Sequence, residues 1–361
     1  HSLRRRQRQM CIRDSNFTAD LAIKNEILPM DELFRFGDQK ATPFLTQNFW
    51  PAMRQNAQLN GVTYAIPFHN STPILYYNKD MFAKAGITAP PKDWDELLGD
   101  SKKLTDAAKG QWGIMLPSTN DDYGAWILSA LTRANGGQYY NADYPGEVYY
   151  DKPSTLGALH FWQNLVYRDK VMPSGVLNSK QISAAFFSGK LGMTMLSTGA
   201  LGFMRENTKD FELGVAMMPA KVRNGVTIGG ASLVSFKGIS DGQKKAAYTF
   251  LQYLVSPKVN GAWSRFTGYF SPRMASYDTP EMKDYLAKDP RAAIALEQLK
   301  YAYPWYSTYE TVAVRQAMEN QLAALVNDEK VTPEAAAVQA QKDADTLMKP
   351  YVESTSLAVP K

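Results

Sequence analysis

The segment Ile66–Phe82 constrains the fold more than any other part of this chain. Its residues predict a strand that Pro67 ends, a polar loop over His69–Thr72, and a second strand over Pro73–Tyr77. A short helix follows over Lys79–Gly86, with glycine at its end. Such a strand–loop–strand–helix unit would hold the hydroxyl and amide side chains of the loop on a fixed backbone, which suits recognition of a polar solute.

The rest of the chain alternates short strands with helices. Strands separated by helices favour an α/β fold with mainly parallel sheets flanked by helices. Helices are predicted over Asn48–Asn56, Trp94–Ala108, Tyr123–Ala134, Thr155–Arg168, Ser179–Ser188, Asp241–Leu254, Pro257–Phe266, Pro280–Lys288 and Arg291–Lys300, and strands over Trp112–Leu116, Leu191–Leu196, Glu212–Ala216 and Ser232–Phe236.

Length and composition fit a large globular protein. The 361 residues are enough for two lobes of ordinary size. Hydrophobic residues make up 45% of the chain and charged residues 21%, which is typical of neither a disordered nor a membrane-embedded protein. No run of 18 apolar residues occurs, so the sequence predicts no membrane-spanning helix.

The net charge of +5 is concentrated at the N-terminus. Residues 1–15 contain five arginines and one aspartate and therefore carry +4 of it, which leaves the remainder nearly neutral. A nucleic-acid-binding surface needs a basic patch on a folded face, so we expect no nucleic-acid partner. Residues 1–15 are either an electrostatic arm or a non-native or disordered leader, and we favour the leader. They lack the apolar core of a secretory signal peptide.

The sequence offers no set of metal ligands and no cofactor motif. Its single cysteine, Cys11, lies in the expected leader, which excludes disulfide and thiolate–metal frameworks elsewhere. The three histidines, His1, His69 and His160, are far apart in the sequence, and zinc-protease, dinucleotide-binding and Walker motifs are absent. We therefore expect no metal and no cofactor.

Two strings carry a resemblance to a known family. Pro-Phe-His-Asn-Ser-Thr-Pro-Ile-Leu-Tyr-Tyr-Asn-Lys-Asp-Met-Phe, ending at Phe82, and Ile-Gly-Gly-Ala-Ser-Leu, ending at Leu233, resemble segments of the extracellular solute-binding proteins (family 1) that serve ABC importers. The similarity runs over nearly all of Asn16–Lys361. Within the family it is greatest to the members that bind sn-glycerol-3-phosphate.

This resemblance implies a fold and a role. The fold would be a two-lobed periplasmic-binding-protein clam of type II, with hinge crossovers near Leu116–Ser118, Gly229–Ser232 and Tyr303–Trp305. The protein would be a periplasmic receptor rather than an enzyme. It would capture glycerol-3-phosphate or a glycerophosphodiester and deliver it to the transmembrane subunits of an ABC importer.

The resemblance also implies a division of the chain. Residues 1–15 would be the leader, residues 16–116 with 233–302 the first lobe, and residues 117–232 with 303–361 the second. In the family, further strand–helix units precede the segment that begins here at Asn16. We therefore expect the first lobe to be incomplete at its N-terminus and this chain to be poorly stable and to bind weakly.

Six positions match ligand-contacting positions of the family. Serine and tyrosine hydroxyls and a glycine N–H suit glycerol hydroxyls and phosphate oxygens, an arginine fork suits phosphate, and a tryptophan near the cleft suits stacking. The matched residues are Ser71, Ser197, Gly230, Tyr269, Arg315 and Trp94.

Each of these positions has a structural alternative. The two serines would equally serve in turns, the glycine in a β-bulge and the tyrosine in the core. Arg315 lies four residues before Glu319, the spacing of an ion pair on a helix surface. The string Pro-Pro-Lys-Asp-Trp that ends at Trp94 would cap the following helix, and Trp126 and Trp263 are predicted to be core residues.

Two alternative functions remain open. The ligand of such a receptor would instead be an uncharged sugar or oligosaccharide, in which case Arg315 would be structural. From a different class, paired carboxylates of a carbohydrate hydrolase would come from Asp121 and Asp122 or from Asp143. These aspartates lie among turn-forming residues, and we favour a role in turns for them.

Overall fold

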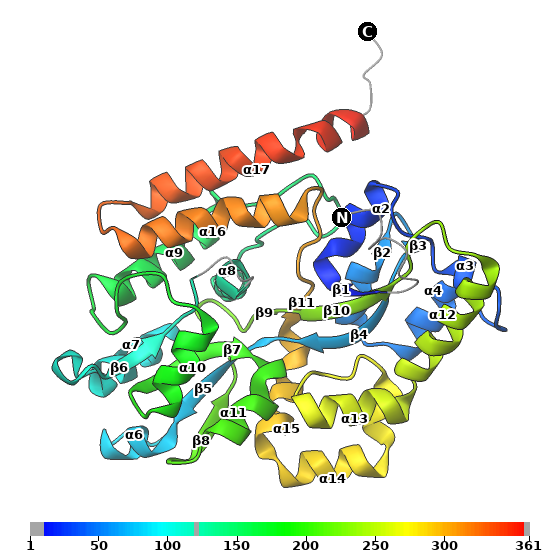
Figure 1. The fold of residues 1–361 in the computed structure, drawn as a ribbon. Coiled ribbons are helices and arrows are strands. Elements are labelled where there is room, and N and C mark those ends of the chain that lie inside the picture. The colour runs from blue at the N-terminus through cyan, green and yellow to red at the C-terminus, as the bar shows by residue number, and fades with distance from the viewer. Residues whose placement is uncertain (1–10, 119–122, 357–361) are drawn as a thin grey trace.

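The structure, a computed structural model, describes residues 11–118 and 123–356. Its two larger sheets lie in separate lobes (Figure 1). The strand order is β1-β10-β4 in the first lobe and β6-β7-β5-β8 in the second. Two short sheets, β2-β3 and β9-β11, complete the strand pairing of the described residues.

The first lobe combines an early and a late part of the chain. Its strands are β1 (Cys11–Asp14), β2 (Gln58–Leu59), β3 (Val62–Thr63), β4 (Ile66–Ser71) and β10 (Gly229–Val234). Its helices are α2 (Thr18–Ile23), α3 (Asp31–Phe34), α4 (Ala41–Asn48), α5 (Pro51–Arg54), α12 (Asp241–Leu254) and α13 (Pro257–Thr267). Helices α3, α4 and α12 lie together at the outer edge of this lobe (Figure 1).

The second lobe is larger. Its strands are β5 (Pro73–Asn78), β6 (Trp112–Met115), β7 (Leu191–Ser197), β8 (Leu213–Ala216), β9 (Val226–Thr227) and β11 (Ala302–Tyr303). Its helices are α6 (Lys79–Lys84), α7 (Trp94–Leu104), α8 (Tyr123–Ala134), α9 (Pro153–Val166), α10 (Ser179–Phe187), α11 (Leu201–Asn207), α14 (Pro280–Lys288), α15 (Pro290–Glu297), α16 (Thr311–Asn327) and α17 (Pro333–Thr355). The long pair α16 and α17 covers one side of the lobe (Figure 1).

The sheets differ from the predicted pattern in strand direction. Only β6–β7 and β9–β11 are parallel among the described strand pairs, and the others are antiparallel. Parallel neighbours need a crossover connection, usually a helix. Strand β5 instead enters its sheet directly from β4, and it pairs in antiparallel fashion with β7 and β8, which come much later in the chain.

The chain first passes between the two sheets at Thr72, the single residue between β4 and β5. The first crossover was instead predicted at Leu116–Ser118. The elements on either side of that segment, β6 and α8, both belong to the second lobe. Because β5 and β6 pair with β7, residues 73–116 pack with the second lobe rather than with the first. The second predicted crossover follows Gly229–Ser232, whereas in the structure the passage from β9 to β10 is at Ile228, and Gly229–Ser232 lie within β10.

Strand β4 extends further than its sequence suggests. Pro67 does not end it, and His69–Ser71, expected as a loop, continue the strand opposite β10. Proline is tolerated on an edge strand or beside a bulge. Both conditions hold here, because β4 lies at the edge of its sheet and the register with β10 shifts between Ala231 and Ser232.

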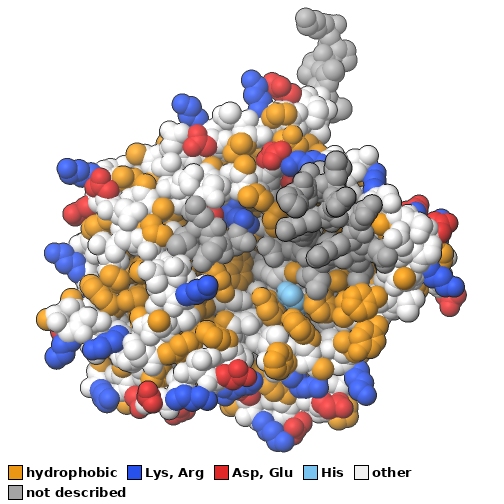
Figure 2. All heavy atoms as spheres, viewed as in Figure 1, with side chains coloured by type: hydrophobic (Ala, Val, Ile, Leu, Met, Phe, Trp, Pro, Cys, Tyr) orange, Lys and Arg blue, Asp and Glu red, His pale blue; other side chains and the backbone are white. Residues whose placement is uncertain are grey.

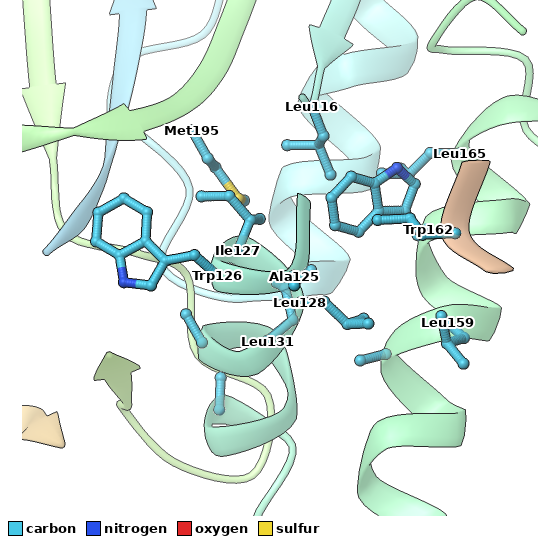
Figure 3. Close-up of a cluster of buried hydrophobic side chains, with 14 of the residues drawn as sticks. Leu116, Ala125, Trp126, Ile127, Leu128, Leu131, Leu159, Trp162, Leu165 and Met195 are labelled. Carbon is cyan, nitrogen blue, oxygen red and sulfur yellow. The ribbon is translucent and has the colours of Figure 1, made fainter. Parts of the chain in front are cut away.

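The second sheet is buried on both faces. On β5, Leu75 packs with one hydrophobic cluster, whereas Ile74 and Tyr76 pack with another, as the alternation of side chains along a strand requires. Helices α8, α9 and α16 contribute to the first cluster, and α10, α11 and α15 to the second. Figure 3 shows part of the first cluster, with Trp126 on the side of α8 away from Trp162 of α9.

Part of the expected leader belongs to the first sheet. Cys11–Asp14 form β1, which pairs antiparallel with residues 231–234 of β10. Residues 1–10 lie outside the described residues. Within the described parts of the chain, no helix combines the length and the apolar character that a membrane crossing requires.

Candidate binding site

A cavity of about 190 Å³ opens where the two lobes meet. Its lining comes from the ends of β4, β7 and β10, from the segment after α13, and from aromatic residues of the second lobe. Small-molecule sites are concave, with a few polar groups that converge on the ligand. The described lining residues are Asn16, His69, Ser71, Tyr123, Trp126, Ser197, Gly229, Gly230, Tyr269 and Trp305.

Four of the six predicted site residues lie in this cavity. Ser71, at the end of β4, is opposite Gly229 of β10. Gly230 has a φ of 103°, and a β-carbon there would stand 2.2 Å from the carbonyl oxygen of His69. Only glycine fits this backbone geometry, so the sequence signal at position 230 reflects close approach of the two strands.

Ser197 is held at the end of β7. It is opposite Pro73 in the sheet, and its Oγ accepts a hydrogen bond of 3.0 Å from the backbone N–H of Gly199. Its carbonyl oxygen accepts a hydrogen bond of 2.8 Å from the buried hydroxyl of Tyr76. The serine therefore caps the following turn and also lines the cavity, so its structural role does not prevent it from facing a ligand.

Tyr269 follows the left-handed glycine that ends α13. Its ring lies so close to Gly199 that a β-carbon there would be within 2.5 Å of the ring. The same ring is 4.2 Å, centroid to centroid, from the imidazole of His69. The first lobe thus supplies a wall of serine, histidine and tyrosine side chains.

The second lobe supplies an aromatic wall. Tyr123 and Trp126 are three residues apart on α8, which places them on one helix face, and their ring centroids are 5.9 Å apart. Trp305 completes this wall. None of the three was a predicted site residue. Trp126 is a core residue, as predicted, and it also lines the cavity, which was not predicted. The i, i+3 spacing of two aromatic residues was the available signal.

Three cavity-lining residues carry buried polar atoms without a hydrogen-bond partner among the described residues. These atoms are Asn16 Oδ1, His69 Nδ1 and Trp126 Nε1. Burial lowers the pKa of His69 from its ordinary value near 6.5 to about 4, so the imidazole is neutral at pH 7. Buried polar atoms are nearly always paired, so these three atoms are open to hydrogen bonds with a bound solute or with water.

Arg315 and Trp94 do not line the cavity. Arg315 lies in the first part of α16 and is 6% exposed, with its Nε 3.9 Å from Oε1 of the buried Glu319. Trp94, at the start of α7, stacks on Phe161 of α9 with ring centroids 4.2 Å apart. The structure therefore gives both residues packing roles, and a role of Arg315 in phosphate recognition stays a prediction.

The described lining residues include no lysine, arginine, aspartate or glutamate. Lys, Arg, Asp and Glu side chains are scattered over the face shown in Figure 2 rather than gathered by sign. Asp121 and Asp122 lie outside the described residues, and the backbone N–H of Asp143 bonds to Asn141 in a turn. No group of three or more potential metal ligands occurs within residues 11–118 and 123–356.

Comparison with known proteins places this geometry in a family. The model of the bacterial extracellular solute-binding proteins matches residues 14–293. The chain belongs to this family. Its fold is correspondingly the two-lobed α/β architecture that was predicted, with helices flanking sheets of mixed direction.

Curated relatives that are named for sn-glycerol-3-phosphate binding match most of this chain. The sn-glycerol-3-phosphate-binding periplasmic protein UgpB of Yersinia pestis is 30% identical over 310 residues, covering 80% of this chain and 67% of the relative. The protein of the same name from Pectobacterium atrosepticum is 28% identical over 366 residues, covering 94% of this chain and 78% of the relative.

Solved structures show the same fold at lower identity. UgpB from Mycobacterium tuberculosis in complex with glycerophosphocholine superposes with a TM-score of 0.82 at 22% identity, covering 95% of this chain and 84% of the other. Maltose-bound MalE3 of T. maritima gives a TM-score of 0.80 at 22% identity, with 94% and 85% covered.

Proposed function

We propose that this protein is the solute receptor of an ABC importer and that it captures a small polar solute between its two lobes. The observation that carries this proposal is the cluster of buried atoms that have no partner among the described residues, Asn16 Oδ1, His69 Nδ1 and Trp126 Nε1, around one interlobe cavity. Both donors and acceptors are available there, which matches a solute that carries hydroxyl groups.

The proposed ligand is sn-glycerol-3-phosphate or a glycerophosphodiester. Relatives at 28–30% identity are named for sn-glycerol-3-phosphate, and one structural neighbour holds glycerophosphocholine. The hydroxyls of Ser71, Ser197 and Tyr269 suit phosphate and glycerol oxygens. The cavity is smaller than a typical drug-sized site, which favours a compact solute.

The family and the names of the relatives support a location on the extracellular side of the membrane, and we propose the periplasm. The partners would be the transmembrane subunits of the importer, since one structural neighbour is described as an ABC transporter solute-binding protein. We propose that the chain performs no chemistry itself, because its relatives are binding proteins.

For the domain division, we propose that residues 73–116 move with the second lobe. Closure would then bring the wall of Ser71 and Tyr269 toward the wall of Tyr123 and Trp126. Such hinge closure around a ligand is a common mode of solute capture.

A sugar is the second candidate ligand, and the aromatic wall favours it. The rings of Tyr123, Trp126 and Trp305 suit stacking on a sugar face, and the described lining carries no charged side chain. A structural neighbour of this chain is bound to maltose.

Calorimetric titration of the purified protein with sn-glycerol-3-phosphate, glycerophosphocholine and maltose tests these proposals. We expect binding of a phosphate compound that Ser71→Ala and Trp126→Ala weaken at least tenfold, while the exposed control Lys342→Ala leaves it unchanged. Binding of maltose alone would favour the sugar. Binding of none of the three, together with turnover of an aryl glycoside, would overturn the receptor proposal.

A further inference from the structure

His69 is the one ionisable imidazole among the described cavity-lining residues. It lies on β4 two residues before Ser71, and the alternation of side chains along a strand places both on the same face. Ser71 and His69 are opposite Gly229 and Ala231 of β10, respectively, so no large side chain of β10 stands directly across from either. The strand therefore offers the cavity a hydroxyl and an imidazole next to each other.

Aromatic rings surround the imidazole. The ring of Tyr269 lies 4.2 Å away, that of Phe68 5.1 Å and the indole of Trp263 6.0 Å, each measured between centroids. The indole is nearly parallel to the imidazole, at 15°. Aromatic rings at such distances interact favourably with a cation and so offset part of the cost of charging the buried imidazole.

An anionic solute in this cavity lacks a permanent countercharge among the described lining residues, since none is lysine or arginine. A buried anion without a partner is expensive in free energy. Neutral hydroxyl and N–H donors offset part of that cost, and a cation offsets more. His69 is the lining residue whose side chain becomes a cation at moderately acidic pH.

We propose that His69 takes up a proton from solvent when an anionic phosphate compound enters the cavity, and that the imidazolium then pairs with the anion. This inference rests on the proposed function, because it assigns the residue that neutralises the proposed ligand. Without the anion the imidazole is neutral; with the anion bound, both ring nitrogens carry a proton and donate hydrogen bonds. The receptor would bind phosphate compounds more tightly in mildly acid surroundings, whereas its affinity for neutral sugars would not depend on pH in this way.

The surroundings of His69 are consistent with this mechanism. Burial is the cause of the fall of its pKa to about 4, and no charged side chain of the described residues contributes to it. The titratable group that contacts the imidazole directly is the phenol of Tyr269, and β10, which pairs with β4, contributes only uncharged residues. A nearby anion raises a histidine pKa by about 1–3 units, which would bring the bound value into the range of about 5–7.

Proton uptake on binding can be measured directly. We would titrate the full chain with sn-glycerol-3-phosphate at pH 5.5 in buffers of different ionisation enthalpy. The same titration with glycerophosphocholine separates protonation of the protein from protonation of the ligand. A phosphodiester has no second ionisation, whereas the second ionisation of a phosphomonoester lies at about pH 6, within the range proposed for His69. The variants are His69→Gln and, as a matched control, His160→Gln, since His160 lies on the surface beside Glu334.

The expected result is uptake by the protein of about 0.2–0.9 of a proton at pH 5.5 with either phosphate compound, as a bound pKa of about 5–7 requires. This uptake should be retained in His160→Gln and lost in His69→Gln. The affinity should rise by up to about tenfold per pH unit as the pH falls through this window. Maltose should show no uptake. Imidazole NMR signals of the wild type give the free and bound pKa of His69 independently, should the variant not fold.

Two results would overturn the inference. Binding without proton uptake, or uptake that persists in His69→Gln, would exclude His69 as the countercharge while leaving the receptor proposal intact. Absence of binding to every phosphate compound would instead remove the proposed ligand itself, and the inference with it.

Discussion

Gly229 lies so close to the indole of Trp126 that a β-carbon at position 229 would stand 2.8 Å from Cζ2 of the ring and 3.2 Å from Oγ of Ser71. The two lobes thus meet across a glycine at the floor of the cavity. A side chain there would occupy the space between a hydroxyl and an aromatic ring that both line the proposed site.

We therefore expect Gly229→Ala to weaken solute binding at least tenfold while the protein remains folded. Gly99→Ala is the matched control, because Gly99 is exposed on α7 and a β-carbon added there would meet no other atom within 4 Å. Alanine in a helix is more favourable than glycine by about 0.5–1 kcal/mol, so the control should gain stability. Calorimetric titration and thermal melts of both variants check this; equal affinity in Gly229→Ala and wild type would contradict it.

Two tryptophans that both lie in apolar surroundings should respond differently to replacement. Trp94 is 4% exposed and packs on Phe161, so Trp94→Ala should cost about 3–5 kcal/mol of stability and spare the affinity of the remaining folded protein. Trp126→Ala removes a cavity wall and should reduce affinity more than stability. Urea denaturation and ligand titration on the same samples separate the two effects. A large loss of affinity in Trp94→Ala would restore its predicted ligand role.

Gln298 forms hydrogen bonds at the first passage between the lobes, at Thr72 and Pro73. Its Nε2 donates to Oγ1 of Thr72 at 2.9 Å and to the carbonyl oxygen of Pro73 at 2.7 Å, and its Oε1 accepts from the backbone N–H of Met218 at 2.6 Å. Gln298→Leu leaves these buried groups unpaired, at about 1–3 kcal/mol for each. The melting temperature should fall by several degrees. Gln339→Leu, on the exposed face of α17, should leave it unchanged.

Arg315 and Glu319 form a buried pair on α16. Removing one member of such a pair is strongly destabilising, by about 3 kcal/mol or more, because the other charge stays buried. Arg315→Ala should therefore melt at a lower temperature, and the double variant Arg315→Ala/Glu319→Gln should recover part of the loss. The predicted role of Arg315 in phosphate recognition needs a separate test. It requires that the folded Arg315→Ala variant lose affinity for sn-glycerol-3-phosphate and keep its affinity for maltose.

Stability should depend on pH through His69. Its folded pKa, about 4, lies below the ordinary value near 6.5, so between these values the unfolded chain binds more protons than the native protein. The free energy of unfolding contributed by this residue is fully present above pH 6.5 and falls as the pH drops toward 4, by at most about 1.4 kcal/mol per pH unit. Urea denaturation between about pH 4 and 7 should show a shallower dependence in His69→Gln than in His160→Gln.

Much of the fold follows from the sequence because apolar periodicity and helix caps are local signals. Helices over Tyr123–Ala134, Asp241–Leu254 and Pro280–Lys288 begin and end where predicted. The predicted helix over Asn48–Asn56 corresponds to α5, which Pro51 starts, and to a 3-10 helix over Gln55–Ala57, whereas α4, which ends at Asn48, was not predicted. Proline favours the first turn of a new helix, a signal that was present in the sequence.

Strand partners are harder to predict, because pairing is decided by tertiary packing. Nothing in the residues on either side of Thr72 indicates that two apolar strands one residue apart belong to different sheets. The same limit applies to the site. Ser71, Ser197, Gly230 and Tyr269 line one cavity, and their binding role stays a prediction, whereas the contributions of Tyr123, Trp126 and Trp305 depend on how the second lobe faces the first.

The one-residue link at Thr72 has a mechanical consequence. Residues next to a hinge move little when two lobes rotate, whereas distant residues move further. Ser71 would therefore hardly shift when the lobes rotate about this link. A solute bound to that hydroxyl in the open molecule would keep its position while the aromatic residues of the second lobe close over it. The solute would therefore bind next to the hinge before the lobes close around it.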